Sequence, residues 1–104
     1  MSSHLQEIEE LTDLMRNEWL DVRLCIELLG YDPAETLLVA FAESEDEMEY
    51  SIIVTRDWRI FECSRSTNEI AEIKFSKVEE IPNSEETFKL TPTIKLALSI
   101  QENL

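Results

Sequence analysis

The chemically richest stretch of the sequence is "ESEDEMEY", residues 43–50, where five carboxylic acids fall within seven positions. These acids are Glu43, Glu45, Asp46, Glu47 and Glu49. Carboxylates at such density can bind cations, act as acid and base, or present negative charge to a basic surface. They are the first candidate site, and the rest of the chain decides among these three chemistries.

A specific metal site is not supported by this stretch. A calcium-binding EF-hand loop needs about 12 residues, with oxygen ligands at alternating positions, a central glycine and a terminal glutamate. Residues 43–50 are too few and contain no glycine. Zinc-ligand spacings are also absent from the sequence. We therefore expect neither a metal nor a cofactor.

The residues that usually accompany catalysis are scarce. His4 is the only histidine and lies close to the N-terminus, so a Ser-His-Asp or Cys-His arrangement cannot be assembled convincingly. Gly30 is the only glycine, whereas a phosphate-binding loop needs several because its backbone must approach the phosphates closely. With 23 acids in the chain, chance pairs of carboxylates are unavoidable. We expect that the protein is not an enzyme.

The two cysteines, Cys25 and Cys63, lie far apart in apolar segments, and neither belongs to a CxxC motif. This pattern is typical of buried, reduced thiols rather than of a redox or metal site. The sequence does not decide whether the two cysteines form a disulfide, and nothing in it requires one.

The charge distribution favours the third chemistry, a negative surface. The net charge is −14, and residues 1–50 hold 14 acids and 2 bases, against 9 acids and 7 bases in residues 51–104. Such a surface repels nucleic acid and anionic membranes and attracts basic proteins. We therefore expect a basic protein partner, no direct nucleic-acid binding and no membrane binding.

The spacing of the acids suggests how such a partner would be held. If residues 43–49 are extended, Glu43, Glu45, Glu47 and Glu49 project to one side at intervals of ~6.8 Å. That spacing is of the order of the distance between phosphates along a nucleic-acid strand. Together with the acids of the N-terminal helix, the cluster would form a broad negative face that competes for a nucleic-acid-binding surface; these acids are Glu7, Glu9, Glu10, Asp13, Glu18 and Asp21. The alternative is a solvated hairpin loop whose charges keep a sheet edge from pairing with other chains.

The first thirty residues have the pattern of a helix. Ser3 and Gln6 fit a capping box, and Gly30 supplies a stop because it tolerates the left-handed conformation. An apolar stripe with spacings of 3 or 4 connects them: Leu5, Ile8, Leu11, Met15, Trp19, Val22, Ile26 and Leu29. A single rod of this length would be ~39 Å, too long for a domain of this size. Either the helix breaks near Asn17, or its N-terminal half projects and pairs with a second copy in a homodimer.

Four strands are predicted next, at residues 36–42, 49–56, 59–65 and 69–78, with short links that favour an antiparallel meander. Asp57 and Trp58 form a tight hairpin between the second and third strands. A large aromatic residue in a turn, flanked here by Arg56 and Arg59, is typical of an anchor at a protein interface. Trp58 therefore joins the acidic residues as a candidate partner-binding residue.

The C-terminal part alternates in a way that fits either strand or helix. Residues 79–86 have the composition of a loop, and we favour a short strand at 87–90 followed by a helix over 93–104 that begins with the pair Thr91 and Pro92. No apolar run approaches the ~20 residues that span a bilayer, and the N-terminus lacks the pattern of a secretory signal. A cytoplasmic location is expected.

These features predict one domain, residues 1–104, of the α+β class: an N-terminal helix packed on a four- to five-stranded antiparallel meander sheet, with a short C-terminal helix. The expected function is a small acidic protein-binding module, most concretely an inhibitor or immunity-type protein that neutralises a basic partner by electrostatic, nucleic-acid-mimicking contacts. One alternative is a small-molecule-binding or enzymatic domain.

A second alternative is a dimeric chaperone or adaptor. The order of one helix followed by three strands, over about residues 5–64, resembles that of the small acidic secretion chaperones at the level of topology. The resemblance implies a homodimer with an apolar groove. The segment "STN", residues 66–68, departs from it, because that family has a long helix between its third and fourth strands.

Overall fold

In the computed structural model, residues 3–43, 48–66 and 77–103 are described, and in chain order helices stand before and after a group of four strands. The helices are α1 (His4–Asn17), α2 (Leu20–Leu28), the 3₁₀ turn η1 (Pro33–Glu35), α3 (Glu85–Leu90) and α4 (Pro92–Glu102). The strands are β1 (Leu37–Glu43), β2 (Met48–Val54), β3 (Ile60–Ser66) and β4 (Lys77–Ile81).

The four strands form one antiparallel sheet in the order β1-β2-β3-β4, so the predicted α+β class with a meander sheet is confirmed. The register pairs Val54 with Ile60 across β2 and β3. Between β1 and β2 the register shifts by one residue, which leaves Val39 as the extra residue of a β-bulge. The strands β1 and β4 are the two edges of this sheet.

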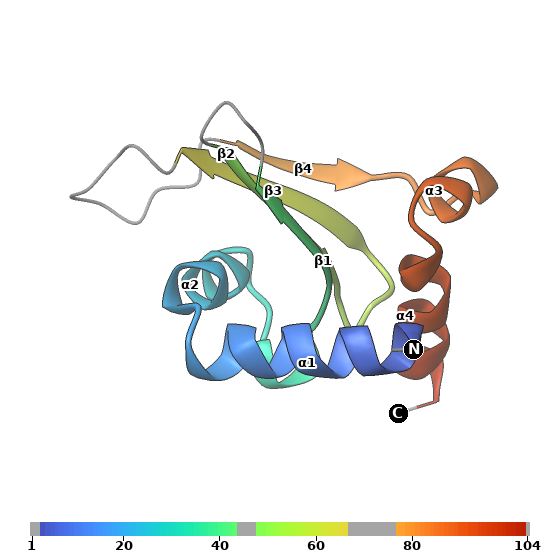
Figure 1. Ribbon diagram of the computed structural model, residues 1–104, viewed down its shortest axis with the longest axis horizontal. Helices are drawn as coiled ribbons and strands as arrows, with labels where there is room; N and C mark the ends of the chain where they lie inside the picture. Colours follow the sequence, from blue (N-terminus) through green and yellow to red (C-terminus); the bar gives the residue numbers. More distant parts are fainter. Residues whose placement is uncertain (1–2, 44–47, 67–76, 104) are drawn as a thin grey trace.

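Both faces of the sheet carry apolar side chains. Successive side chains of a strand point to opposite sides, and the strands contain consecutive apolar residues, so each face receives some of them. Val54 and Ile60 belong to one core cluster, together with Ile94 and Ala97 of α4. Their sequence neighbours Ile53 and Phe61 belong to a second cluster, on the other face. Val22 and Ile26 of α2 complete that second cluster. Figure 1 shows the result, with α2 on one side of the sheet and α3 and α4 on the other.

Helix α1 lies across the β1 edge of the sheet and contributes to both cores (Figure 1). Ile8 is buried in the α4-side cluster, and Met15 is buried in the α2-side cluster. Between them, the hydroxyl of Thr12 bonds the backbone of Leu38 in β1. The helix therefore packs on the edge rather than on one face, which the sequence pattern alone did not indicate.

The predicted break in the long N-terminal helix is present, directly after Asn17. Trp19 has ψ of 72°, outside the helical range, and its ring lies 4.6 Å from that of Phe41 between centroids. The break lets the apolar stripe turn onto the sheet, so Ile8 and Met15 are buried within the chain itself. The stripe therefore does not require a second copy for its burial, although homodimerisation as such stays a prediction.

The predicted start and end of the N-terminal helical region are present, except that the capping box forms only in part. Gly30 has φ of 94° and ends α2, and the Tyr31 amide returns to the Ile26 carbonyl in the bond that typically closes such an end. Ser3 accepts a hydrogen bond from the Gln6 amide, as a capping residue does. The Gln6 side chain, however, bonds Glu10 instead of returning to Ser3, so only half of the capping box forms.

The prediction of a strand at residues 87–90 is wrong. These residues belong to α3, which follows Ser84 and has Glu85 and Glu86 in its first turn, where acidic side chains favour a helix. The alternation that suggested a strand does not mark a buried face, because Leu90 is 85% exposed. The following helix is confirmed as α4, with Pro92 in its first turn.

The fourth strand extends further along the chain than predicted. Residues 79–81, assigned to a loop from their composition, belong to β4, in which Ile81 pairs with Ile60. Most of the predicted strand at 69–78 lies outside the described residues. None of the described helices is long and apolar enough to cross a membrane.

Candidate functional site

The tip of the β2–β3 hairpin places Trp58 at the surface in an unusual backbone conformation. The loop Arg56–Trp58 is closed by a hydrogen bond from the Thr55 amide to the Arg59 carbonyl, at 2.9 Å. In three-residue hairpin loops of this kind the last residue is left-handed and usually glycine. Here Trp58 has φ of 64° and is 52% exposed, and it is the one non-glycine residue with positive φ in the described part of the chain.

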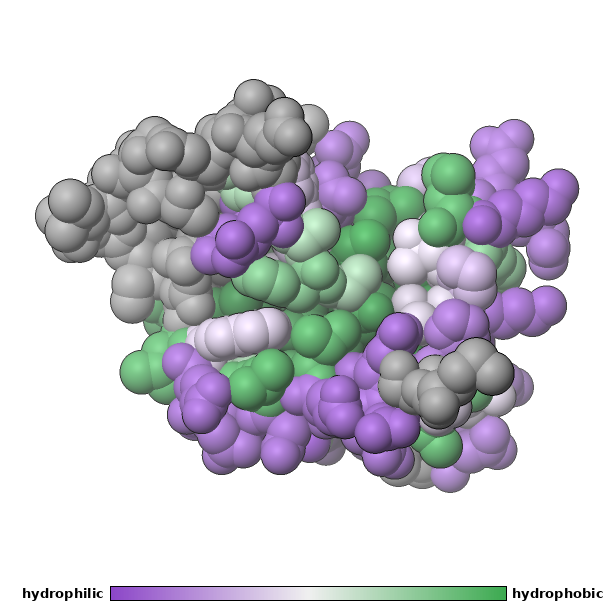
Figure 2. All heavy atoms as spheres, in the orientation of Figure 1, coloured by the Kyte–Doolittle hydropathy of each residue, from purple (hydrophilic) through white to green (hydrophobic). Residues whose placement is uncertain are grey.

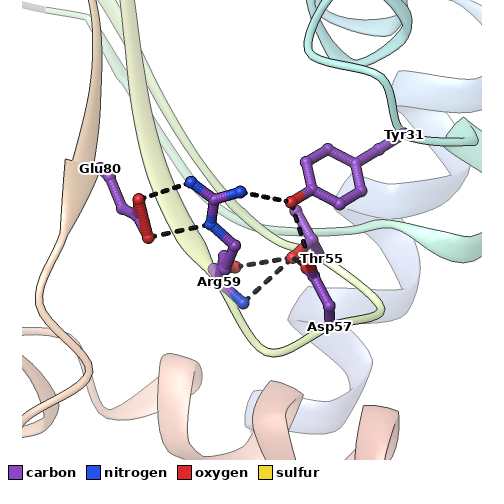
Figure 3. Close-up of polar contacts among 5 residues, drawn as sticks. All are labelled: Tyr31, Thr55, Asp57, Arg59 and Glu80. Atoms are coloured by element: carbon purple, nitrogen blue, oxygen red, sulfur yellow. Dashed lines mark hydrogen bonds and ion pairs between the residues drawn. The ribbon is translucent and has the colours of Figure 1, made fainter.

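A polar network holds this hairpin tip against its neighbours (Figure 3). The Arg59 guanidinium makes a two-pronged ion pair with the Glu80 carboxylate of β4, at 2.7 and 3.0 Å. The same guanidinium donates to the Tyr31 hydroxyl, which in turn donates to Asp57. The Thr55 hydroxyl bonds Asp57 and accepts from the Arg59 amide. The backbone around Trp58 is therefore fixed from several sides.

The network shifts the pKa values of its charged members. The Thr55 hydroxyl bond, with a further contribution from Tyr31, lowers the pKa of Asp57 below its ordinary value of 3.8. The hydrogen bonds from Arg59 lower the pKa of Glu80 below 4.5, and the same hydrogen bonds to Glu80 raise the pKa of Arg59. These groups are ionised at neutral pH and paired with one another, which favours a structural role for the network rather than acid–base catalysis.

The described acids of the cluster, Glu43 and Glu49, lie at the other end of the sheet from Trp58. Glu43 ends β1 and pairs with Glu49 of the antiparallel strand β2, so these two acids lie opposite each other and not in succession along one strand. Glu45, Asp46 and Glu47 lie outside the described residues. From Glu49 to Thr55 the strand β2 covers roughly 20 Å. The structure thus does not bring Glu43 and Glu49 together with Trp58.

A second acidic surface lies on α1, within the broader negative face that the sequence predicts for the N-terminal helix. Glu9, Glu10 and Asp13 are exposed on the outward side of this helix. In the part of the chain that the structure describes, none of the three lies within 4 Å of a cationic side chain, as the four ion pairs involve other acids. Figure 2 shows hydrophilic residues along the side of the molecule where α1 lies. We call Glu9, Glu10 and Asp13 the α1 acidic face.

An apolar groove of about 480 Å³ runs beside the α1 acidic face. Leu5 of α1, Leu37 at the start of β1 and Ile100 of α4 provide its apolar lining, and Glu9, Glu10 and Asp13 line its α1 side. These three acids were among those that the sequence placed on the negative face of the N-terminal helix, and their spacing at positions i, i+1 and i+4 puts them side by side. The groove could not be found in that way, because Leu37 and Ile100 are distant in the chain.

The two cysteines meet in the core. Cys25 of α2 and Cys63 of β3 are both buried thiols that form no disulfide, and their sulfur atoms lie 3.5 Å apart. The hydrogen bond with Cys25 and burial raise the pKa of the Cys63 thiol. The prediction of two buried thiols is confirmed. Within the described ranges, no three His, Cys, Asp or Glu side chains are arranged to hold a metal ion.

Comparisons of the chain with protein-family models, with curated proteins and with solved structures found no match. Any functional conclusion therefore depends on the geometry and charge described above.

Proposed function

We propose that this chain is an acidic protein-binding module that binds a basic partner protein and covers its positively charged surface, as an inhibitor or immunity-type protein does. The observation that carries the proposal is the α1 acidic face: exposed carboxylates that form no ion pair within 4 Å in the described chain, beside an apolar groove. Charge speeds and orients the encounter, and apolar contacts lengthen the life of the complex.

The surrounding charges support this role for α1. Glu80 and Glu35 are paired with Arg59 and Arg56 at the hairpin tip, so their charge is partly neutralised within the molecule. Arg16 is the nearest cation on α1, and its guanidinium donates to the carbonyls of Pro33, Ala34 and Thr36 rather than to an acid. The α1 acidic face thus keeps its negative charge for an incoming partner.

Trp58 is proposed as a second contact for the partner. It lies at the end of the sheet where β1 begins and β2 ends, and α1 contacts β1 near the same end through the bond between Thr12 and Leu38. Glu43 and Glu49 lie at the opposite end, so a partner on α1 would reach Trp58 more easily than these two acids. Glu43 and Glu49 contribute in this proposal to the general field that attracts a basic protein.

The test is an affinity pull-down from native lysate at low salt, followed by a salt step and mass spectrometry of the eluate. Two triple variants of identical chemistry are compared with the wild type. One changes the α1 acidic face (Glu9→Gln, Glu10→Gln, Asp13→Asn), and the other changes the cluster (Glu45→Gln, Asp46→Asn, Glu47→Gln). Each variant removes three negative charges, so the two variants have the same net charge and differ only in where the charges are lost.

We expect the wild type to retain a basic protein in stoichiometric amount and to release it in the salt step. The cluster variant should still retain this protein, and the α1 variant should lose it. Loss by the cluster variant alone would move the working surface to residues 43–49, as the sequence first suggested. Absence of any salt-released basic protein from the wild-type eluate would overturn the function itself.

One observation favours the second candidate, a dimeric chaperone or adaptor. Leu20, Leu24 and Leu28 follow each other at i, i+4 and i+8 along α2 and are 60%, 39% and 80% exposed. Such a stripe is an apolar helix face without a partner in the described chain. Sedimentation equilibrium of the wild type and of a Leu24→Gln variant tests it: a dimer that the substitution weakens supports the candidate, and a monomeric wild type at high concentration excludes this dimer.

A further inference from the structure

The groove beside α1 has an apolar floor that the molecule's own core leaves open. Leu5 occupies the same helical stripe as Ile8, yet Leu5 is 44% exposed whereas Ile8 is buried. Leu37 and Ile100 pack on the α4-side core with one side and line the groove with the other. The volume, about 480 Å³, is within the range of cavities that take up several large side chains or a small ligand.

The charge around this floor is one-sided. Glu9, Glu10 and Asp13 line the groove together with a single cation, Arg16. The Arg16 guanidinium bonds three backbone carbonyls, with N–O distances between 2.9 and 3.3 Å, and forms no ion pair with these acids. An occupant of the groove therefore meets an apolar strip with a row of carboxylates along one side.

The backbone of β1 offers little to an extended occupant at this place. A peptide that adds a strand to a sheet needs free N–H and C=O groups on the edge strand. Thr12 already bonds the amide and the carbonyl of Leu38, and Thr93 bonds the carbonyl of Val39. Side chains, rather than backbone groups, must therefore recognise whatever lies in the groove.

We propose that the groove binds an amphipathic basic helix of the partner, with its apolar residues on Leu5, Leu37 and Ile100 and its Lys or Arg residues facing Glu9, Glu10 and Asp13. This inference rests on the proposed function and names the element of the partner that α1 recognises. A second copy of this chain is a poor occupant, because two molecules that each carry a net charge of −14 repel each other. Helix α1 has 14 residues, so the bound helix would be of similar length.

The test uses two synthetic 14-residue peptides of leucine and lysine with the same composition. In one, the leucines follow a helical spacing of 3 and 4 and form a stripe; in the other, their order is scrambled so that no stripe forms. Binding is measured by isothermal titration calorimetry against the wild type, a Leu5→Gln variant and a Leu90→Gln control. Leu90 is more exposed than Leu5 and lies on α3, outside the residues that line the groove.

The proposal expects one amphipathic peptide per chain, bound about tenfold more tightly than the scrambled one. Leu5→Gln should remove most of this preference and Leu90→Gln should not, while circular dichroism verifies that both variants stay folded. Equal binding of the two peptides, with both weakened by the α1 triple variant, would overturn the helix-binding groove and leave the proposed function intact.

Two other outcomes have equally definite meanings. If neither peptide binds, the groove proposal is overturned, and the pull-down with the two triple variants then decides separately whether the proposed function holds. If the free wild type sediments as a dimer that Leu5→Gln dissociates, the occupant of the groove is a second copy and the proposal is overturned.

Discussion

The hydroxyl of Thr12 in α1 bonds both backbone groups of Leu38 in the edge strand β1. It accepts from the Leu38 amide at 3.0 Å and lies 3.5 Å from the Leu38 carbonyl oxygen, and both residues are buried. One side chain thus satisfies two polar groups that an edge strand would otherwise leave without partners. This contact fixes α1 on the edge of the sheet and with it the position of the α1 acidic face.

The first prediction concerns this contact. Thr12→Val keeps the shape of the side chain but leaves the buried amide and carbonyl of Leu38 without partners, so the free energy of unfolding should fall by about 1–3 kcal/mol. Urea denaturation followed by tryptophan fluorescence measures this change. Thr12→Ser, which keeps the hydroxyl, should lose clearly less. Equal stability of the Val variant and the wild type would show that Thr12 does not hold the edge.

The second prediction concerns the backbone at Trp58. A residue with a Cβ atom in the left-handed region costs about 1–2 kcal/mol, and glycine avoids that cost. Trp58→Gly should therefore be more stable than Trp58→Ala by about 1 kcal/mol, since both variants lack the ring and differ only at Cβ. Thermal unfolding of the pair gives the comparison. If the two variants unfold at the same temperature, the hairpin has relaxed out of the left-handed conformation.

The third prediction concerns the pH dependence of the hairpin network. The folded-state pKa values of Asp57 and Glu80 lie below their ordinary values of 3.8 and 4.5, so both carboxylates stabilise the fold at neutral pH. This contribution is lost as the pH falls through 4.5 and 3.8 towards the lower folded-state values. Asp57→Asn and Glu80→Gln should each flatten the acid side of the stability curve.

The measurement for this prediction is the free energy of unfolding between pH 7 and acid, for each variant against the wild type. Glu86→Gln, a change of an exposed glutamate in α3 with no ion pair in the described chain, serves as the control for total charge. A control curve as flat as those of the network variants would mean that general charge, and not the network, sets the acid sensitivity.

The fourth prediction concerns the buried thiols. Cys25 and Cys63 are enclosed in the core, and the raised pKa of Cys63 keeps it protonated, whereas thiol reagents attack the thiolate. Alkylation of the native protein should therefore proceed only as fast as the core opens. Mass spectrometry after timed exposure to iodoacetamide should find two labels in denaturant and none at early times without it. Rapid native labelling at Cys63 would contradict this packing.

The sequence predicted those parts of the fold that have local causes. Gly30 ends a helix because of its left-handed backbone, and the alternating segments on either side of Asp57 and Trp58 pair as a hairpin. The strand predicted at 87–90 failed because Phe88 and Leu90 alternate without being buried on one face, while Ser84 and the two glutamates after it begin a helix. An alternating pattern over so few residues cannot by itself distinguish a strand from a helix, because the choice depends on which side chains are buried in the folded protein.

The candidate site was predictable to a smaller extent. The exposure of Trp58 followed from its place in a turn, and its left-handed backbone was not foreseen, because a hairpin of this kind normally has glycine there. The groove depends on the packing of Leu5, Leu37 and Ile100 from three elements. Such a contact arises only when the helix is placed on the sheet edge, and no spacing in the sequence encodes it.

The central claim is that α1 and its groove bind a basic partner, and backbone amide NMR of the ¹⁵N-labelled protein tests it most directly. The amphipathic leucine–lysine peptide is titrated into the wild type while the amide shifts are followed. The account predicts that the largest changes fall on residues 5–16, on Leu37 and on Ile100, with Leu90 unchanged. Changes concentrated at residues 43–50, or spread evenly over the molecule, would contradict it.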